Sequence, residues 1–191
     1  MPFERAVTRA LFTAFALIVP SSAAAQQQQP LGPAAWRMSP EYRQVQAQSL
    51  QTQRRILLAM ADSMPENLYR DKATPAQRDF AQQIHHAANG NVMIAAGFIA
   101  GGQPPQMPDT APTFNTRTGL KAFINAAYDY LDQLMADQSD DDRHQMVRFF
   151  GTPIPKWQAW DEVEEHTIWT AGQVVANFRK HGMAPPAFSF F

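Results

Sequence analysis

The chain has 191 residues, of which 45% are hydrophobic and 17% are charged, so it carries enough apolar side chains for one packed domain. Its formal net charge is −1, and no basic stripe runs along any predicted helix, which argues against a nucleic-acid partner. The sequence contains no cysteine, which excludes disulfides, cysteine-ligated metal sites and a thiol nucleophile.

Residues 1–25 have the pattern of an export signal. Two arginines precede an apolar run over residues 10–19, and Ala23 and Ala25 provide the small residues of a cleavage site before Gln26. The apolar run is too short to span a bilayer as a standard helix, although an uncleaved membrane anchor is the alternative. We therefore expect a periplasmic or secreted protein with no transmembrane span after signal cleavage.

The next segment, residues 26–37, is polar and contains proline, which predicts a flexible linker to a domain over residues 38–191. A first helix is predicted to begin after Ser39, which can act as the N-cap, and to end near Met64.

A second helix is predicted to begin at Thr74 and Pro75, a favourable N-cap and first position, and to end at Gly101. Its apolar residues recur with a period of roughly 3.6 residues. The following residues 101–115 include four prolines and are predicted to form a long loop.

A third helix is predicted over residues 117–137, and a short helix over residues 139–151. The last helix is predicted from Lys156 to His181, because Gly182 can take the left-handed cap and Pro185 forbids continuation. The sequence thus predicts an all-α domain of four long helices packed as a bundle, with a short extra helix between helices 3 and 4. An irregular, orthogonal helical array is the alternative.

The last helix also carries a spaced motif. After His166 come two glycines, an arginine and a pair of prolines: Gly172, Arg179, Gly182, Pro185 and Pro186. This spacing resembles the final helix of the DinB-like family of metalloenzymes, also called DinB/YfiT-like. An earlier stretch resembles the family's second helix: Arg78, Phe80, Ile84, His86, Ala88 and Asn91. Residues 120–134 resemble its third helix, so the resemblance covers about residues 40–190.

The resemblance implies a four-helix bundle of DinB/YfiT-like type with a metal centre. In that family one histidine of the second helix and two of the fourth bind a divalent ion, and His86 and His166 match two of them. Thr170 occupies the position of the third, and a hydroxyl is a poor ligand for Zn²⁺ or Ni²⁺. The implied metal site is therefore weak or absent, with Glu162 as a candidate replacement ligand. Alternatively, both histidines are simply buried and hydrogen-bonded, and Glu162 is solvated near the helix start.

Two functions follow as expectations. The first is an exported binding or interaction module with a degenerate site of two histidines and a threonine, which takes a small-molecule ligand and is compatible with a homodimer. The alternative is a divalent-metal-dependent hydrolase or thiol-dependent transferase with a rebuilt site. The most useful observation for both is whether the side chains of His86, His166 and Thr170 converge within about 5 Å.

Overall fold

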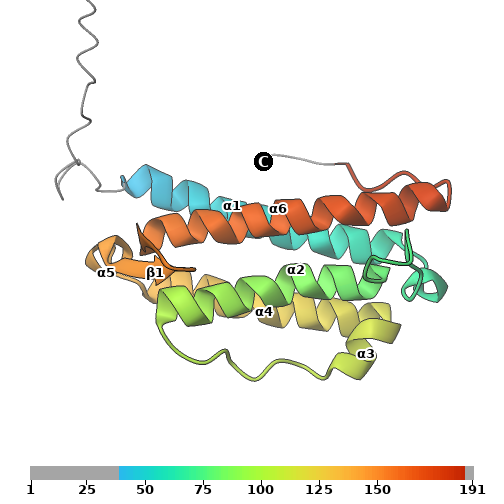
Figure 1. Cartoon of the computed structure of the whole chain (residues 1–191), viewed down its shortest axis with the longest axis horizontal. Coiled ribbons are helices and arrows are strands. Elements are labelled where there is room, and N and C mark those ends of the chain that lie inside the picture. The colour runs from blue at the N-terminus through green and yellow to red at the C-terminus, as the bar shows by residue number, and fades with distance from the viewer. Residues whose placement is uncertain (1–38, 188–191) are drawn as a thin grey trace, which may run out of the picture.

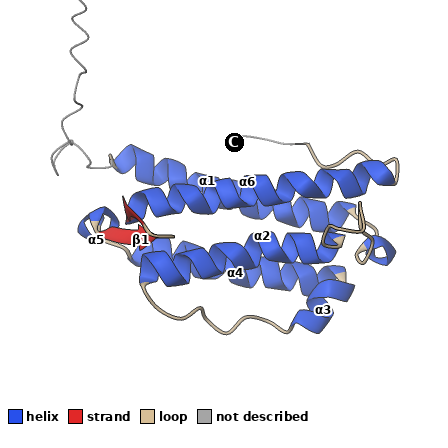
Figure 2. Ribbon diagram, in the orientation of Figure 1, coloured by secondary structure: helices blue, strands red, loops and turns tan. Residues whose placement is uncertain are grey.

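The computed structural model describes residues 39–187, so the predicted signal peptide and linker lie outside the described residues. The described chain is mostly helical, as the sequence predicts (Figures 1 and 2). In chain order the elements are α1 (Pro40–Ser63), the 3₁₀ turn η2 (Glu66–Leu68), α2 (Phe80–Ile94), the π-helical turn η3 (Ala95–Ala100), α3 (Thr110–Asn115), α4 (Arg117–Asp137), α5 (Asp140–His144), β1 (Met146–Phe149), β2 (Thr152–Pro155) and α6 (Lys156–Lys180).

The long helices α1, α2, α4 and α6 lie side by side (Figure 1). α2 packs against α6 and α4, and α1 packs against the same two helices from the other side. Each long helix therefore has two long neighbours, and the apolar stripes of all of them meet in one core. Within residues 39–187, no helix combines the length and the apolar character that crossing a membrane requires.

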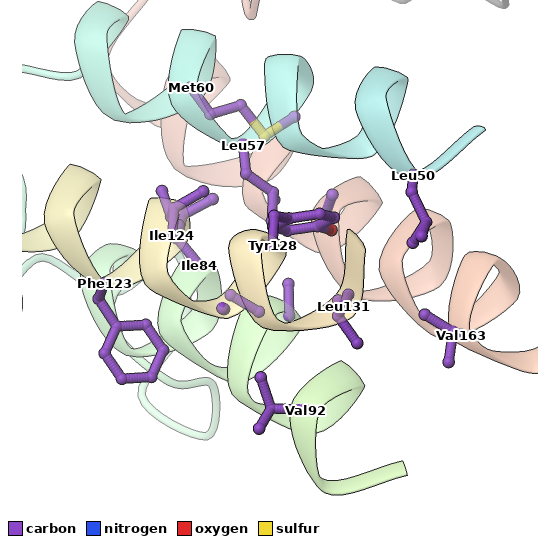
Figure 3. Close-up of a cluster of buried hydrophobic side chains, with 14 of the residues drawn as sticks. Leu50, Leu57, Met60, Ile84, Val92, Phe123, Ile124, Tyr128, Leu131 and Val163 are labelled. Atoms are coloured by element: carbon purple, nitrogen blue, oxygen red, sulfur yellow. The ribbon is translucent and has the colours of Figure 1, made fainter. Parts of the chain in front are cut away.

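Figure 3 shows the centre of this core, where aliphatic and aromatic side chains from all four long helices interlock. Its members include Leu50, Leu57, Met60, Ile84, Val92, Phe123, Ile124, Tyr128, Leu131 and Val163. Each is at most 6% exposed, and burying a side chain of this size contributes about 1.5–3 kcal/mol. This apolar contact holds α2 and α6, the two helices that form the candidate site, in a fixed relation.

Several predicted boundaries are confirmed. Ser39 caps α1 by accepting a hydrogen bond from the Tyr42 amide. α4 spans the predicted residues 117–137, and α6 ends one residue earlier than predicted. Gly182 follows α6 with φ +68°, in the left-handed conformation that glycine adopts without strain.

The predicted start of the second helix at Thr74 is wrong, because α2 begins at Phe80. Asp79 and Gln82 form a capping box, in which each side chain accepts a hydrogen bond from the other residue's amide, at 2.8 and 3.2 Å. The Asp79 carboxylate is also paired with Arg70 at 2.7 Å. The helix begins after Asp79 rather than at Thr74 and Pro75, because the Asp79 cap is stabilised by both Gln82 and Arg70.

The stretch 101–115 is not entirely a loop, because its end forms the short helix α3. Asp109 caps α3 by accepting a hydrogen bond from the Ala111 amide. α3 packs closely on α4, since a Cβ added at Gly119 would lie 2.4 Å from the Pro112 backbone. Prolines suggested a loop, but the cap and the close contact at Gly119 stabilise one and a half turns of helix.

The all-α prediction also needs correction between α5 and α6. α5 ends at His144, and the residues that follow form an antiparallel hairpin in which Met146 pairs with Pro155 and Phe149 with Thr152. The strands are joined by Phe150 and Gly151, both with positive φ (45° and 93°), as in the two-residue turns that match strand twist. Phenylalanine is an unusual residue there, which is why the sequence did not indicate a hairpin.

Candidate functional site

A pocket of about 820 Å³ lies between α2 and α6, which run side by side in Figure 2. Each helix contributes residues spaced three or four apart, which share one helix face. The hairpin closes one end of the pocket. The lining residues are His86, Asn89, Gly90, Met93 and Ile94 of α2, Phe149 and Phe150 of the hairpin, and Glu162, Glu165, His166, Ile168 and Trp169 of α6.

The two histidines predicted from the sequence meet in this pocket. The ring centroids of His86 and His166 are 5.2 Å apart, and the ring planes are nearly perpendicular at 80°. The two residues are 80 positions apart in the sequence and come from different helices, so tertiary packing brings them together. Both side chains are partly buried and line the pocket wall.

Gly90 makes room for the His166 ring. A Cβ added at this position would lie 2.2 Å from Cε1 and 2.8 Å from Nε2 of His166, closer than real Cβ contacts. Gly90 lies four residues after His86, on the same face of α2, where glycine costs helix stability by about 1 kcal/mol relative to alanine. The absence of a side chain therefore lets the imidazole of α6 lie across the backbone of α2.

Asn91 fixes the orientation and tautomer of His166. The Asn91 amide nitrogen donates to the Thr167 hydroxyl at 2.6 Å, so its carbonyl oxygen is the atom that faces His166 Nδ1 at 2.9 Å. Because a carbonyl oxygen only accepts, Nδ1 carries the proton and donates it. In the neutral ring, the lone pair then lies on Nε2. An imidazole held in this way by its second nitrogen is the arrangement found at metal-binding histidines.

Behind His166, a buried polar layer takes one side chain from each long helix: Gln53 of α1, Asn91 of α2, Tyr128 of α4 and Thr167 of α6. The Thr167 hydroxyl donates to Gln53 Oε1 at 2.7 Å, and the Tyr128 hydroxyl lies 3.3 Å from the Asn91 amide nitrogen. All four side chains are at most 3% exposed. Burial raises the pKa of Tyr128, so this phenol remains protonated.

Burial also sets the charge state of the histidines. Desolvation lowers the pKa of His166 below its usual value, and the nearby His86 and Arg78 lower it further. The pKa of His86 is lowered by the same desolvation and then by Arg78. Both rings are therefore neutral at pH 7, the state in which an imidazole binds a metal ion or accepts a hydrogen bond.

The remaining two predicted site residues differ in their position. Glu162 lines the pocket, and its pKa is raised by desolvation and then by Glu165 and Asp161. Thr170 is 2% exposed and is not among the pocket-lining residues, and its backbone carbonyl accepts a hydrogen bond from Gln83 at 3.3 Å. Within residues 39–187, no group of three or more His, Cys, Asp or Glu side chains is placed to hold a metal ion.

The other histidines lie outside the pocket. His85 packs against the Phe123 ring, with centroids 4.2 Å apart, and His181 lies 2.7 Å from a carboxylate oxygen of Asp71. Nδ1 of His144 lies 2.6 Å from the Asp140 carbonyl. These contacts are structural.

Sequence reasoning missed part of the pocket. Trp169 was not among the predicted site residues, but it lines the pocket and is 77% exposed. Phe149 and Phe150 were missed because they reach the pocket only through the unpredicted hairpin. Gly90 carried a usable signal, since a glycine one turn after a candidate ligand in a helix interior indicates a close approach.

No protein-family model, curated protein or solved structure matches this chain.

Proposed function

We propose that the protein is an exported DinB-like binding module that takes a small ligand into the pocket between α2 and α6. The observation that carries this proposal is the approach of His86 and His166 within one pocket, with ring centroids 5.2 Å apart. Two neutral imidazoles at the wall of a largely apolar pocket provide a few fixed polar groups in an apolar lining, as small-molecule sites do. The bundle of DinB/YfiT-like type is part of the same proposal.

The residues present fit a weak divalent-metal site. His86 and His166 would be the ligands, with Nε2 of His166 presented by the bond from Nδ1 to Asn91. Glu162 lines the same pocket but forms no three-residue group with the histidines, so its side chain would have to change conformation to become the candidate third ligand. A bound Zn²⁺ or Ni²⁺ supplies Lewis acidity and lowers the pKa of bound water. With two imidazoles rather than three, we expect weak binding.

The same arrangement supports the second candidate function, a metal-dependent hydrolase or thiol-dependent transferase. The specific observation in its favour is the Asn91 hydrogen bond, because a fixed tautomer is a feature of working metal ligands. Here His86 and His166 would hold the ion and Glu162 would accept or deliver a proton. The apolar residues of the pocket would exclude water from the substrate.

Metal analysis of the untagged protein separates the two functions. A binding module with a degenerate site should retain less than stoichiometric zinc or nickel after dialysis, and isothermal titration should give weak binding that His86→Ala and His166→Ala abolish. Stoichiometric metal that disappears in both variants would favour the enzyme. Metal binding that persists in both variants would contradict either use of this pocket.

The variant Thr170→His tests the resemblance on which the proposal draws. Restoring an imidazole one turn after His166 should tighten zinc binding by at least about tenfold, or about 1.4 kcal/mol. Thr170→Val serves as the control, because it removes the hydroxyl without adding a ligand. No gain in Thr170→His would mean that a side chain at this position does not reach the ion.

Export is tested separately by N-terminal sequencing of the protein recovered from the cell envelope. Cleavage after Ala25 should leave Gln26 as the first residue. An intact N-terminus in the membrane fraction would instead favour the uncleaved anchor.

A further inference from the structure

The charges that line the pocket are of one sign. Glu162 and Glu165 contribute two carboxylates, and no lysine or arginine is among the described residues of the lining. The two glutamates are three residues apart on α6 and share a helix face. Arg78 acts on both histidines from outside the lining, so the two glutamates are the acidic residues that a ligand in the pocket would meet.

The two carboxylates differ in exposure, because Glu162 is partly buried and Glu165 is exposed. Glu162 is partly buried, so it loses solvation, and it experiences the like charges of Glu165 and Asp161. A cation bound between Glu162 and Glu165 would relieve this repulsion and replace the lost solvation. Glu165 and the neighbouring Trp169 are exposed, so this attraction acts partly through solvent and should weaken as salt is added.

Most of the other lining side chains on the hairpin and on α6 are aromatic or aliphatic. Phe149 and Phe150 pack together with centroids 4.9 Å apart, and Phe98 of η3 lies 4.8 Å from each of them. Trp169 stands at the mouth. Aromatic faces attract organic cations, by about 0.5–2 kcal/mol for each contact, and also cover apolar chains.

The backbone of Phe150 adopts a conformation that is unfavourable for a bulky side chain. It has φ 45°, a conformation that costs a bulky residue about 1–2 kcal/mol, and yet its side chain is 77% exposed. Asparagine or glycine would suit the turn better. The contacts of Phe150 with Phe98 and Phe149 offset part of this cost, and the exposed part of its ring remains accessible to a ligand at the edge of the pocket.

We propose that the ligand is a small organic cation with an apolar tail, its ammonium group seated between Glu162 and Glu165 and its hydrocarbon against Phe149, Phe150 and Trp169. This proposal rests on the proposed function, because it names the ligand class of the same pocket. It goes further in specifying the sign of the ligand's charge and the two carboxylates that would bind its head group.

The test compares three probes with one alkyl chain and different head groups: octyltrimethylammonium, octanol and octanoate. Each is titrated calorimetrically into the purified protein at pH 7 and low salt, below its micelle concentration. The cation should bind at least about tenfold more tightly than the anion, with octanol between them. Added salt should weaken binding of the cation and leave octanol unaffected.

Four variants locate the effect. Glu162→Gln and Glu165→Gln should each weaken binding of the cation by at least about threefold and leave octanol binding unchanged. Glu164→Gln is the matched control, because Glu164 lies on the same helix and is not among the pocket-lining residues. Trp169→Ala should weaken all three probes.

The outcomes distinguish the two proposals. If octanoate binds as tightly as the cation, the cationic ligand is overturned while the binding module stands. The same conclusion follows if both glutamine variants keep the preference for the cation. Failure of all three probes to bind overturns the module and the cation together. If the two glutamine variants lose the preference for the cation and Glu164→Gln keeps it, the binding module and the cationic ligand are both supported.

Discussion

His166 is positioned by two residues of the neighbouring helix α2. Gly90 provides the space for its ring, and Asn91 holds the protonated nitrogen at 2.9 Å. Neither residue would bind a ligand or metal through these contacts, but both decide which atom of His166 the pocket presents. At this scale the geometry of the site depends on an absent side chain as much as on the side chains that are present.

Replacing Gly90 with alanine should displace the His166 ring. The added methyl group would lie 2.2 Å from Cε1, so the ring must turn and lose its bond to Asn91. The gain in helix propensity, about 1 kcal/mol, roughly offsets the lost hydrogen bond, so the free energy of unfolding should change little. Long-range ¹H–¹⁵N NMR of the imidazoles should show loss of the single His166 tautomer.

Gly172→Ala is the matched control for this substitution. Gly172 is also in a helix interior, but a Cβ there meets nothing within 4 Å. Its alanine variant should be more stable by about 0.5–1 kcal/mol and retain the wild-type imidazole spectrum. An unchanged His166 spectrum in Gly90→Ala would show that the ring does not lie over this position.

Phe150→Asn separates the turn from the pocket. Asparagine tolerates positive φ, which recovers about 1 kcal/mol, while loss of the contacts with Phe98 and Phe149 costs about 0.5–1.5 kcal/mol. Stability measured by urea unfolding should therefore stay within about 1 kcal/mol of wild type. Binding of octyltrimethylammonium should weaken several-fold, and an unchanged affinity would remove Phe150 from the pocket wall.

At the scale of elements, α2 and α6 form the site, and the polar layer joins them to α1 and α4. Thr167→Val keeps the side-chain shape and removes the hydroxyl that bonds to Asn91 and Gln53. The two partners then remain buried without this contact, which should destabilise the fold by about 1–3 kcal/mol. Urea unfolding measures the loss.

The exposed Thr118 of α4 provides the comparison for this substitution. Thr118→Val should change the free energy of unfolding by less than about 0.5 kcal/mol. An equally small effect of Thr167→Val would show that the layer contributes little to stability.

The sequence predicted the elements whose signals are local. α4 and α6 were predicted to within a residue, because each has an amphipathic stripe, and α6 also has a glycine cap. The start of α2 was wrong because two competing caps lie five residues apart, and only the tertiary contacts of Arg70 and Asp79 decide between them. The hairpin was missed because its turn residue, Phe150, is unfavourable for that turn in isolation.

For the candidate site, the residues were predictable but their surroundings were not. The resemblance to the DinB-like family implied His86 and His166, and the structure brings them together. The acidic and aromatic character of the pocket arises from α6 and the hairpin facing α2, which no local pattern reveals. Thr170 is buried and is not among the pocket-lining residues, so the expected position of its hydroxyl beside the two histidines stays a prediction.

At the scale of the whole molecule, Asp71 links the segment before α2 to the end of α6. Its carboxylate accepts hydrogen bonds from Lys180 at 2.8 Å and from His181 at 2.7 Å. These contacts, with Lys180 first, hold the pKa of Asp71 below its usual value. The stabilisation is therefore complete above the unfolded-state pKa of about 3.9 and is lost as the pH falls through the lower folded-state value.

Asp71→Asn should accordingly make the free energy of unfolding less dependent on pH in the acidic range. Urea unfolding at intervals between about pH 2.5 and 6 should show a smaller loss of stability on acidification than in the wild type. Lys180→Met, which removes the first partner and keeps the carboxylate, should reduce this pH dependence partly. A wild-type pH dependence in both variants would contradict this role for Asp71.

The polar layer also has a consequence for the alignment of the helices. Sliding one long helix by a full turn, about 5.4 Å, would return an apolar face to the core and leave most hydrophobic contacts equivalent. The same slide would carry Gln53, Asn91, Tyr128 or Thr167 away from its partners and bury them unpaired. We therefore expect the apolar core to supply the strength of packing, and these four residues to select the single axial offset at which His86 and His166 stand opposite each other.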